Sequence, residues 1–306
     1  MRKVIRGILS LGILLILIVL AVLYLERNFE DFSELRFVSP MIILALILLF
    51  IFGYFLIGLT TKQLIKPLKI NLGYFESFAL SIVTGFYNLI TPLRGGMAVR
   101  AVYLKKKHNF SYTNFFSSLS ASYVLIFLSA GIMGLLSSGI IYLKEGIFSP
   151  VVSLIFLGVS LSLLFVIIFS PRMNEGRGFI LDKIAKILNG RYLIRKDRGL
   201  LFFITIISIF QLLLSSLMLY LQFYVFGIEI DFVKTLFLSS IGLLGLIISI
   251  TPAGLGIQEA VAVFSASTIG ISPVESLSVA LLGRGVSVVV LFVLGPIFSW
   301  VLMRKR

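Results

Sequence analysis

Long apolar segments separated by short polar ones make up most of the chain. An α-helix needs about 20 mainly apolar residues to cross the hydrocarbon core of a bilayer. The hydrophobic pattern therefore predicts three spanning helices in each half of the chain. We expect them at residues 8–25, 38–59, 115–143, 151–169, 200–226 and 277–303.

Two further apolar segments, 75–90 and 235–250, run directly into a Thr-Pro pair and then into glycines. Proline lacks the backbone N–H and glycine permits unusual dihedral angles, so we expect the helix to break at both places. Broken backbone at membrane depth is tolerated only where protein or a water-filled cavity surrounds it. The residues expected to make the breaks are Pro92, Gly95, Gly96, Pro252, Gly254 and Gly256.

The two interrupted segments match each other without a gap. Gly85, Pro92 and Gly96 of the first segment have the same spacing as Gly245, Pro252 and Gly256 of the second. Paired interrupted segments in corresponding places of two halves indicate a transporter-like binding site at their meeting point. We therefore divide the chain into two repeats, 1–146 and 147–306.

The charge pattern predicts how these segments are oriented. Basic residues gather at the N-terminus, around 62–69, in 94–108, in 171–199 and at the C-terminus, whereas the loop 26–37 is acidic. Because basic loops stay cytoplasmic, both termini should lie inside the cell. This holds if each interrupted segment turns back to the side from which it entered.

The predicted fold is thus an all-α polytopic protein of the cell membrane, with two inverted repeats. Each repeat has three spanning helices and one re-entrant hairpin broken by Pro and Gly. Eight ordinary spans with kinks at the same prolines would give the same orientation of the termini, and the sequence leaves that alternative open.

The composition of the chain limits the kinds of ligand and chemistry that we expect. The net charge of +14 sits in short loops between spans, so it indicates membrane topology and contact with anionic lipids rather than nucleic-acid binding. The chain has no cysteine and one histidine, His108, which we expect to be an ordinary solvated side chain. We expect no metal site, no cofactor and no catalytic residues.

Placing an ionisable residue at membrane depth costs free energy, so such a residue indicates a function by default. Glu259 and Arg284 are predicted either to form a structural ion pair or to handle a lipid headgroup. Arg94 and Arg100 either bind phosphate, which suits the guanidinium fork, or anchor the loop on the cytoplasmic side. Asn88 either satisfies backbone freed by the break or contacts a headgroup.

On these residues the chain resembles the membrane-embedded, flippase-like domain of the lysylphosphatidylglycerol synthase family. The matching residues are Asn88, Pro92, Arg94, Gly95, Gly96 and Arg100, then Pro252, Gly254, Gly256, Glu259 and Arg284. The chain departs from the family pattern at Met97, where an acid is expected. We also expect no soluble aminoacyl-transfer domain, so the resemblance does not imply that enzymatic activity.

The resemblance implies a protein that binds or translocates a phosphate-containing polar lipid at a midplane site between the two hairpins. Two alternatives stay open at this point. One is a non-catalytic scaffold for a lipid-modifying enzyme, and the other is a membrane enzyme acting on lipid. The expected partners are anionic membrane lipids, with a second copy of the chain or a lipid-modifying enzyme as further candidates.

The re-entrant topology can be tested by labelling. Cysteines introduced singly at Lys69 and Lys106 should both react with an impermeant reagent from the cytoplasm. Cysteines at Glu229 and Glu275 should both react from outside, because each pair flanks one hairpin. The chain has no native cysteine to confuse the readout. Labelling from opposite sides within either pair would contradict re-entrance.

Overall fold

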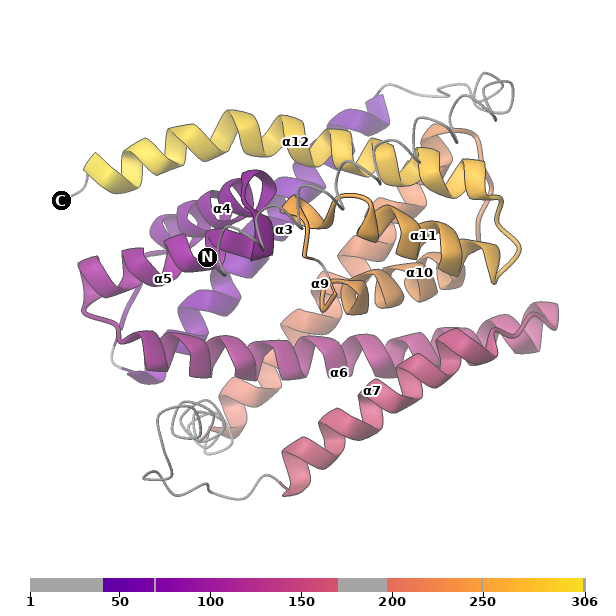
Figure 1. Ribbon diagram of the computed structural model, residues 1–306, viewed down its shortest axis with the longest axis horizontal. Coiled ribbons are helices and arrows are strands. Elements are labelled where there is room, and N and C mark those ends of the chain that lie inside the picture. The colour runs from indigo at the N-terminus through magenta and orange to yellow at the C-terminus, as the bar shows by residue number, and fades with distance from the viewer. Residues whose placement is uncertain (1–40, 69, 170–196, 249, 305–306) are drawn as a thin grey trace, which may run out of the picture.

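The computed structural model describes residues 41–68, 70–169, 197–248 and 250–304 (Figure 1). The first predicted span, the acidic loop 26–37, Lys69 and nearly all of the loop 171–199 lie outside these residues. The part of the chain that is described consists of α-helices and short 3₁₀ turns joined by brief connections.

The helices follow the hydrophobic pattern closely. They are α3 (Met41–Ile65), α4 (Tyr74–Ile90), α5 (Gly95–His108), α6 (Tyr112–Glu145), α7 (Pro150–Phe169), α9 (Arg198–Val225), α10 (Phe232–Gly245), α11 (Ile257–Ser267) and α12 (Pro273–Arg304). The 3₁₀ turns are η1 (Lys66–Leu68), η2 (Pro92–Arg94) and η3 (Pro252–Gly254). Within the described ranges, five helices (α3, α6, α7, α9 and α12) are long and apolar enough to cross a membrane.

Polar caps set the beginnings of several helices. Ser111 accepts a hydrogen bond from the Asn114 amide at 3.2 Å and starts α6. Asp197 accepts one from the Leu200 amide at 3.0 Å and starts α9. Each cap satisfies an N–H group that has no partner within its own helix.

Two apolar clusters define the two ends of the molecule. The first end brings together the end of α3, the segment before α4, the loop before α6, the start of α6 and the end of α12, through Ile65, Leu72, Phe110, Phe115 and Leu302. The second end brings together the end of α6, the loops on either side of α10 and the segment after α11, through Ile141, Ile147, Ile228, Ile269 and Ile271. The long helices run between these ends (Figure 1).

The segment α4–α5 is a helical hairpin that begins and ends at the first end. Oε1 of Glu76, in the first turn of α4, lies 2.8 Å from Nε2 of His108 and 3.0 Å from Nζ of Lys107, at the end of α5. The prediction that His108 is simply solvated is therefore wrong. The acidic residue at the hairpin's entrance gives the imidazole a partner.

The segment α10–α11 is a second hairpin, and it begins and ends at the second end. Nζ of Lys144 lies 2.7 Å from Oδ2 of Asp231, and Nζ of Lys234 lies 2.7 Å from Oε2 of Glu145. These ion pairs join the start of α10 to the end of α6. Hydrogen bonds from Lys144 and from the Val233 amide lower the pKa of the Asp231 carboxyl.

The tips of the two hairpins meet. The backbone N–H of Leu93 donates to the carbonyl of Ile250 over 3.1 Å, and η2 packs against η3. The two breaks found in the sequence are thus neighbours in space, although they lie far apart along the chain.

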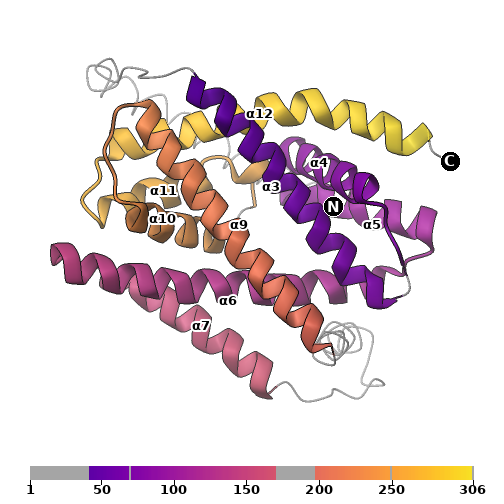
Figure 2. The ribbon, with the colours of Figure 1, turned by 180° about the vertical axis from the view of Figure 1, so that it is seen from behind.

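The helix contacts of one half recur in the other. α4 packs against α12 as α10 packs against α6, and α3 packs against α4 as α9 packs against α10. Helices α3 and α9, which correspond to each other in the two halves, are in contact. Figure 2 shows them side by side on the face turned toward the viewer. The last long helix of each half thus supports the broken helix of the other half.

At the first break, the unusual dihedral angles do not belong to the glycines for which they were predicted. Gly95 has a right-handed helical conformation and begins α5 together with Gly96. The positive φ angles fall instead on Leu93 (54°) and Arg94 (56°). Gly96 is needed for space, because a Cβ there would lie 2.0 Å from the carbonyl oxygen of Thr84.

At the second break the glycines do supply the unusual dihedrals. Gly254 and Gly256 have φ angles of 69° and 76°, and Ala253 between the proline and the first glycine has a φ of 50°. α10 also ends earlier than predicted, at Gly245. The amides of the following residues, 246–248, bond to carbonyls three positions back, which tightens the chain before the break.

Replacing Gly96 should test this close approach. Gly96→Ala should lower the stability by about 3 kcal/mol or more, since the methyl group meets backbone that cannot move aside. Gly139→Ala on α6 is the matched control, because a Cβ there meets nothing within 4 Å. The measurement is the midpoint of heat denaturation of the purified protein. Equal midpoints for the two variants would contradict the close packing of α5 on α4.

Candidate functional site

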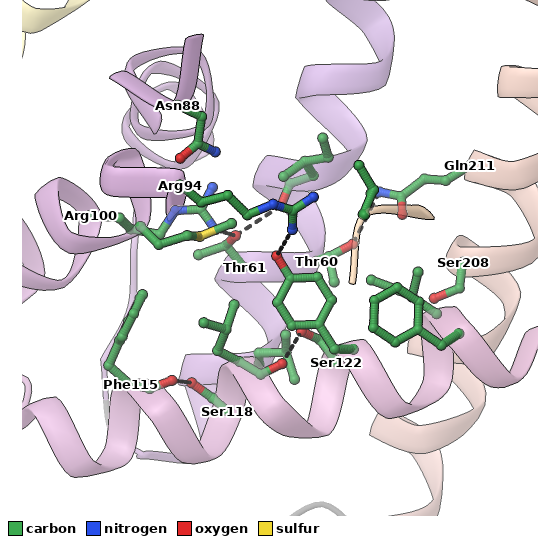
Figure 3. Close-up of a pocket in the computed structure, with 18 of the residues that line it drawn as sticks. Thr60, Thr61, Asn88, Arg94, Arg100, Phe115, Ser118, Ser122, Ser208 and Gln211 are labelled. Carbon is green, nitrogen blue, oxygen red and sulfur yellow. Dashed lines mark hydrogen bonds between the residues drawn. The ribbon is translucent and has the colours of Figure 1, made fainter. Parts of the chain in front are cut away.

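A cavity of about 270 Å³ lies beside the tip of the first hairpin (Figure 3). Helices α3, α4, α5, α6, α9 and α10 and the turn η2 contribute to its wall. The polar side chains on which the following argument depends are Thr60, Thr61, Asn88, Arg94, Arg100 and Gln211. No carboxylate is found among the described residues that line the cavity.

Arg100 is held inside this wall by hydroxyl groups. Its side chain is buried, with Nε donating to Oγ1 of Thr84 at 3.0 Å and Nη1 donating to Oγ1 of Thr61 at 3.1 Å. Hydroxyls orient the guanidinium but do not neutralise it. Arg100 therefore brings an uncompensated positive charge to the cavity.

Arg94 reaches the same cavity from η2. Its left-handed backbone conformation turns the side chain toward α6, where Nη1 donates to the Tyr123 hydroxyl at 3.0 Å. In one regular helix, residues six positions apart such as Arg94 and Arg100 would lie on different faces. Because the helix breaks between α4 and α5, both side chains line one cavity. Within the described ranges neither Arg94 nor Arg100 forms an ion pair with a carboxylate.

Asn88 lines the cavity on the last turns of α4. Its Oδ1 atom is buried and has no hydrogen-bond partner in the described part of the chain. The carbonyl of Tyr87, freed at the end of the helix, accepts instead from both the amide and the hydroxyl of Thr91. Capping by Thr91 thus leaves the Asn88 oxygen unused at the cavity.

The second break carries the ion pair that the sequence left as one of two alternatives. Arg284 on α12 donates to Oε1 of Glu259 through Nε at 3.0 Å and through Nη2 at 2.6 Å. Both side chains are mostly buried, with 18% and 12% of their surfaces exposed. The pair joins α11 to α12.

The same pair also satisfies backbone freed by the break. Nη1 of Arg284 donates to the carbonyl of Ala253 at 2.9 Å, and Oε2 of Glu259 accepts from the Gly256 amide at 2.7 Å. Arg284 is therefore neutralised by its partner, in contrast to Arg94 and Arg100. A headgroup site at this pair stays a prediction.

Several contacts of the site were not predicted from the sequence. Thr61 and Thr84 orient Arg100, and Tyr123 receives Arg94. Threonine bonds to its own helix equally well, and Tyr123 is one of 11 tyrosines in the chain. The one available signal was the polar pair Thr60-Thr61, which directly follows the apolar segment 38–59.

Five long apolar helices in the described ranges define a multi-pass membrane protein. The chain belongs to the family described as the lysylphosphatidylglycerol synthase TM region, whose model matches residues 8–295. It is also similar to a UPF0104 membrane protein of Methanocaldococcus jannaschii, at 27% identity over 267 residues. That alignment covers 80% of each chain.

Breaking the ion pair should be costly. Glu259→Gln or Arg284→Met alone should destabilise the fold by about 3–5 kcal/mol, because each leaves a buried charge without its partner. The double variant should recover part of this loss. It should not recover all of it, because Arg284→Met also removes the hydrogen bond to the Ala253 carbonyl. The neutral glutamine oxygen also accepts from the Gly256 amide more weakly than the carboxylate does.

A double-mutant cycle on denaturation midpoints measures this coupling. The control pair is Lys144→Met with Glu259→Gln, whose positions share no contact. Strictly additive losses for Glu259 and Arg284 would contradict the pairing.

Proposed function

We propose that this chain binds the phosphate of a polar membrane lipid between Arg94 and Arg100 and moves the headgroup between leaflets. The observation that carries the proposal is the pair of arginines without a carboxylate partner in a cavity at the meeting point of two broken helices. Arg100 is buried and Arg94 is partly buried, and positive charge in such places without a carboxylate partner favours an anion from outside the chain.

The chemistry of the site suits phosphate. The guanidinium group presents donors in a planar fork that matches phosphate oxygens. The hydroxyls of Thr61, Thr84 and Tyr123 hold the two guanidinium groups in place before any ligand arrives. Such preorganisation reduces the entropy lost on binding.

The proposal includes the placement of the chain in the bilayer. The two hairpins are re-entrant, with α4–α5 entering from the cytoplasm and α10–α11 from outside, and the two halves are inverted repeats. Support comes from the recurrence of helix contacts between halves and from the meeting of the tips. Both termini face the cytoplasm of a cell whose plasma membrane holds the protein.

Charge supports this orientation. Lys66, the run 105–107 and Arg198 lie at the first end of the molecule, whereas Glu229 and Glu275 lie at the second. Cytoplasmic loops are the basic ones. The cavity with Arg94 and Arg100 would then receive headgroups from the inner leaflet.

The role of the guanidinium group in phosphate binding can be tested by a substitution that keeps the positive charge. Arg94→Lys should strongly slow inversion of a fluorescent anionic phospholipid in vesicles reconstituted with the purified protein. Lysine offers a point charge where arginine offers parallel donors. Folding and insertion should be unchanged, since the positive charge at the loop persists. Arg198→Lys, at an exposed position at the start of α9, is the matched control.

Wild-type inversion by Arg94→Lys would remove the binding role from this arginine. Absence of inversion by the wild-type chain, with an altered lipid product, would favour an enzyme instead. Absence of both, with a co-purifying enzyme, would favour a scaffold. Arg100→Lys is less informative, because it also removes the hydrogen bonds to Thr61 and Thr84.

A further inference from the structure

A second cavity adjoins the first. It has a volume of about 320 Å³ and is lined by residues of α9, α10, α11 and α12. Ser215, Leu243 and Leu246 line both cavities. The arginine-bearing cavity and its neighbour therefore adjoin at these three side chains.

The second cavity is lined by apolar side chains and by several polar side chains that carry no charge. Its hydrogen-bonding side chains in the described ranges are neutral: Ser215, Gln222, Ser239, Gln258 and Ser276. The Ser239 hydroxyl has no hydrogen-bond partner within the described part, and the residue is only 7% exposed. The hydroxyl oxygen itself is covered, so it bonds to a ligand only after the short side chain rotates toward the cavity.

One face of α9 connects the two cavities. Ser208, Gln211, Ser215 and Gln222 follow one another at spacings that place them along the same side of the helix. The first two line the arginine-bearing cavity, Gln222 lines the second, and Ser215 lines both. A headgroup that leaves the first cavity past Ser215 thus meets neutral hydrogen-bonding groups.

We propose that the second cavity holds the uncharged, hydroxyl-bearing part of the headgroup, so that the cargo is a phosphate lipid carrying a sugar or polyol rather than an amine. This inference rests on the proposed function, since it assumes that the phosphate lies between Arg94 and Arg100. Amides and hydroxyls of the protein exchange hydrogen bonds with sugar hydroxyls, which both donate and accept.

An ammonium group would be poorly received. No carboxylate lines either large cavity among the residues that are described. Glu259 lines a smaller cavity that shares Gln258 and Ala280 with the second one, but its oxygens are engaged by Arg284 and by the Gly256 amide. A buried ammonium without a counter-charge is unfavourable.

The test compares three short-chain lipids that share one phosphodiester. Dioctanoyl phosphatidylmethanol carries no further polar group and reports on phosphate binding alone. Dioctanoyl phosphatidylinositol adds hydroxyls, and dioctanoyl phosphatidylethanolamine adds an ammonium. Titration calorimetry on the whole purified chain in detergent should give the tightest binding for the inositol lipid. We expect the ethanolamine lipid to bind more weakly than the methanol lipid.

Two serines give a matched pair of variants. Ser239→Ala should weaken binding of the inositol lipid about three- to tenfold, the range for one lost hydrogen bond, and leave the methanol lipid unchanged. Ser278→Ala is the control, because Ser278 is equally buried and its hydroxyl is also unpartnered in the described residues, but it lines neither cavity. Neither variant loses a hydrogen bond of the fold.

The outcomes separate the two proposals. If the methanol lipid does not bind, or binds equally well to Arg94→Gln, the phosphate site itself is wrong. If it binds and depends on Arg94, but the ethanolamine lipid binds as tightly as the inositol lipid, the inference about the second cavity is overturned alone. Equal effects of Ser239→Ala and Ser278→Ala on the inositol lipid would overturn it as well.

Discussion

The arrangement depends on one constraint: backbone groups freed inside a membrane must find partners within the protein. Both broken helices expose such groups, and each break is satisfied by the rest of the fold. The Leu93 amide bonds to the Ile250 carbonyl of the opposite break, and Arg284 takes up the Ala253 carbonyl. Thr91 takes up the carbonyl of Tyr87. These bonds tie the two tips together, and the cavities lie around the place where they meet.

The two halves meet this constraint with different electrostatics. The second half places a carboxylate, Glu259, against its arginine, and the pair closes on itself. The first half has Met97 after its glycines and surrounds Arg94 and Arg100 with hydroxyls instead. The Pro-Gly break thus occurs twice with different results. At the second break an ion pair neutralises the arginine, and at the first break the arginines leave the cavity positively charged. In the proposed function this difference decides where a phosphate binds, and the uncharged second cavity decides what the phosphate carries.

Much of the fold could be predicted because membrane helices are recognised by their long runs of apolar residues and by the few polar residues within those runs. Five of the predicted spans lie in the described residues, and they, both breaks and the Glu259–Arg284 pair, which was one of two alternatives, follow from such signals. The glycines of the first break were misread because a sequence does not distinguish a glycine needed for its dihedral angle from one needed for space. Gly96 belongs to the second kind. His108 was misread because its partner, Glu76, lies across the hairpin, and its contact depends on the turn of the chain. The uncharged lining of the second cavity depends on how four helices pack, which periodicity alone does not specify.

The central claim is that a lipid phosphate enters the protein at the tips of the broken helices. The most direct measurement is an experimental structure of the whole chain in nanodiscs made of an anionic phospholipid. The account predicts phosphate density within hydrogen-bonding distance of the guanidinium groups of Arg94 and Arg100. Headgroup density confined to the surface of the bilayer, with the cavity holding acyl chain or water alone, would contradict it.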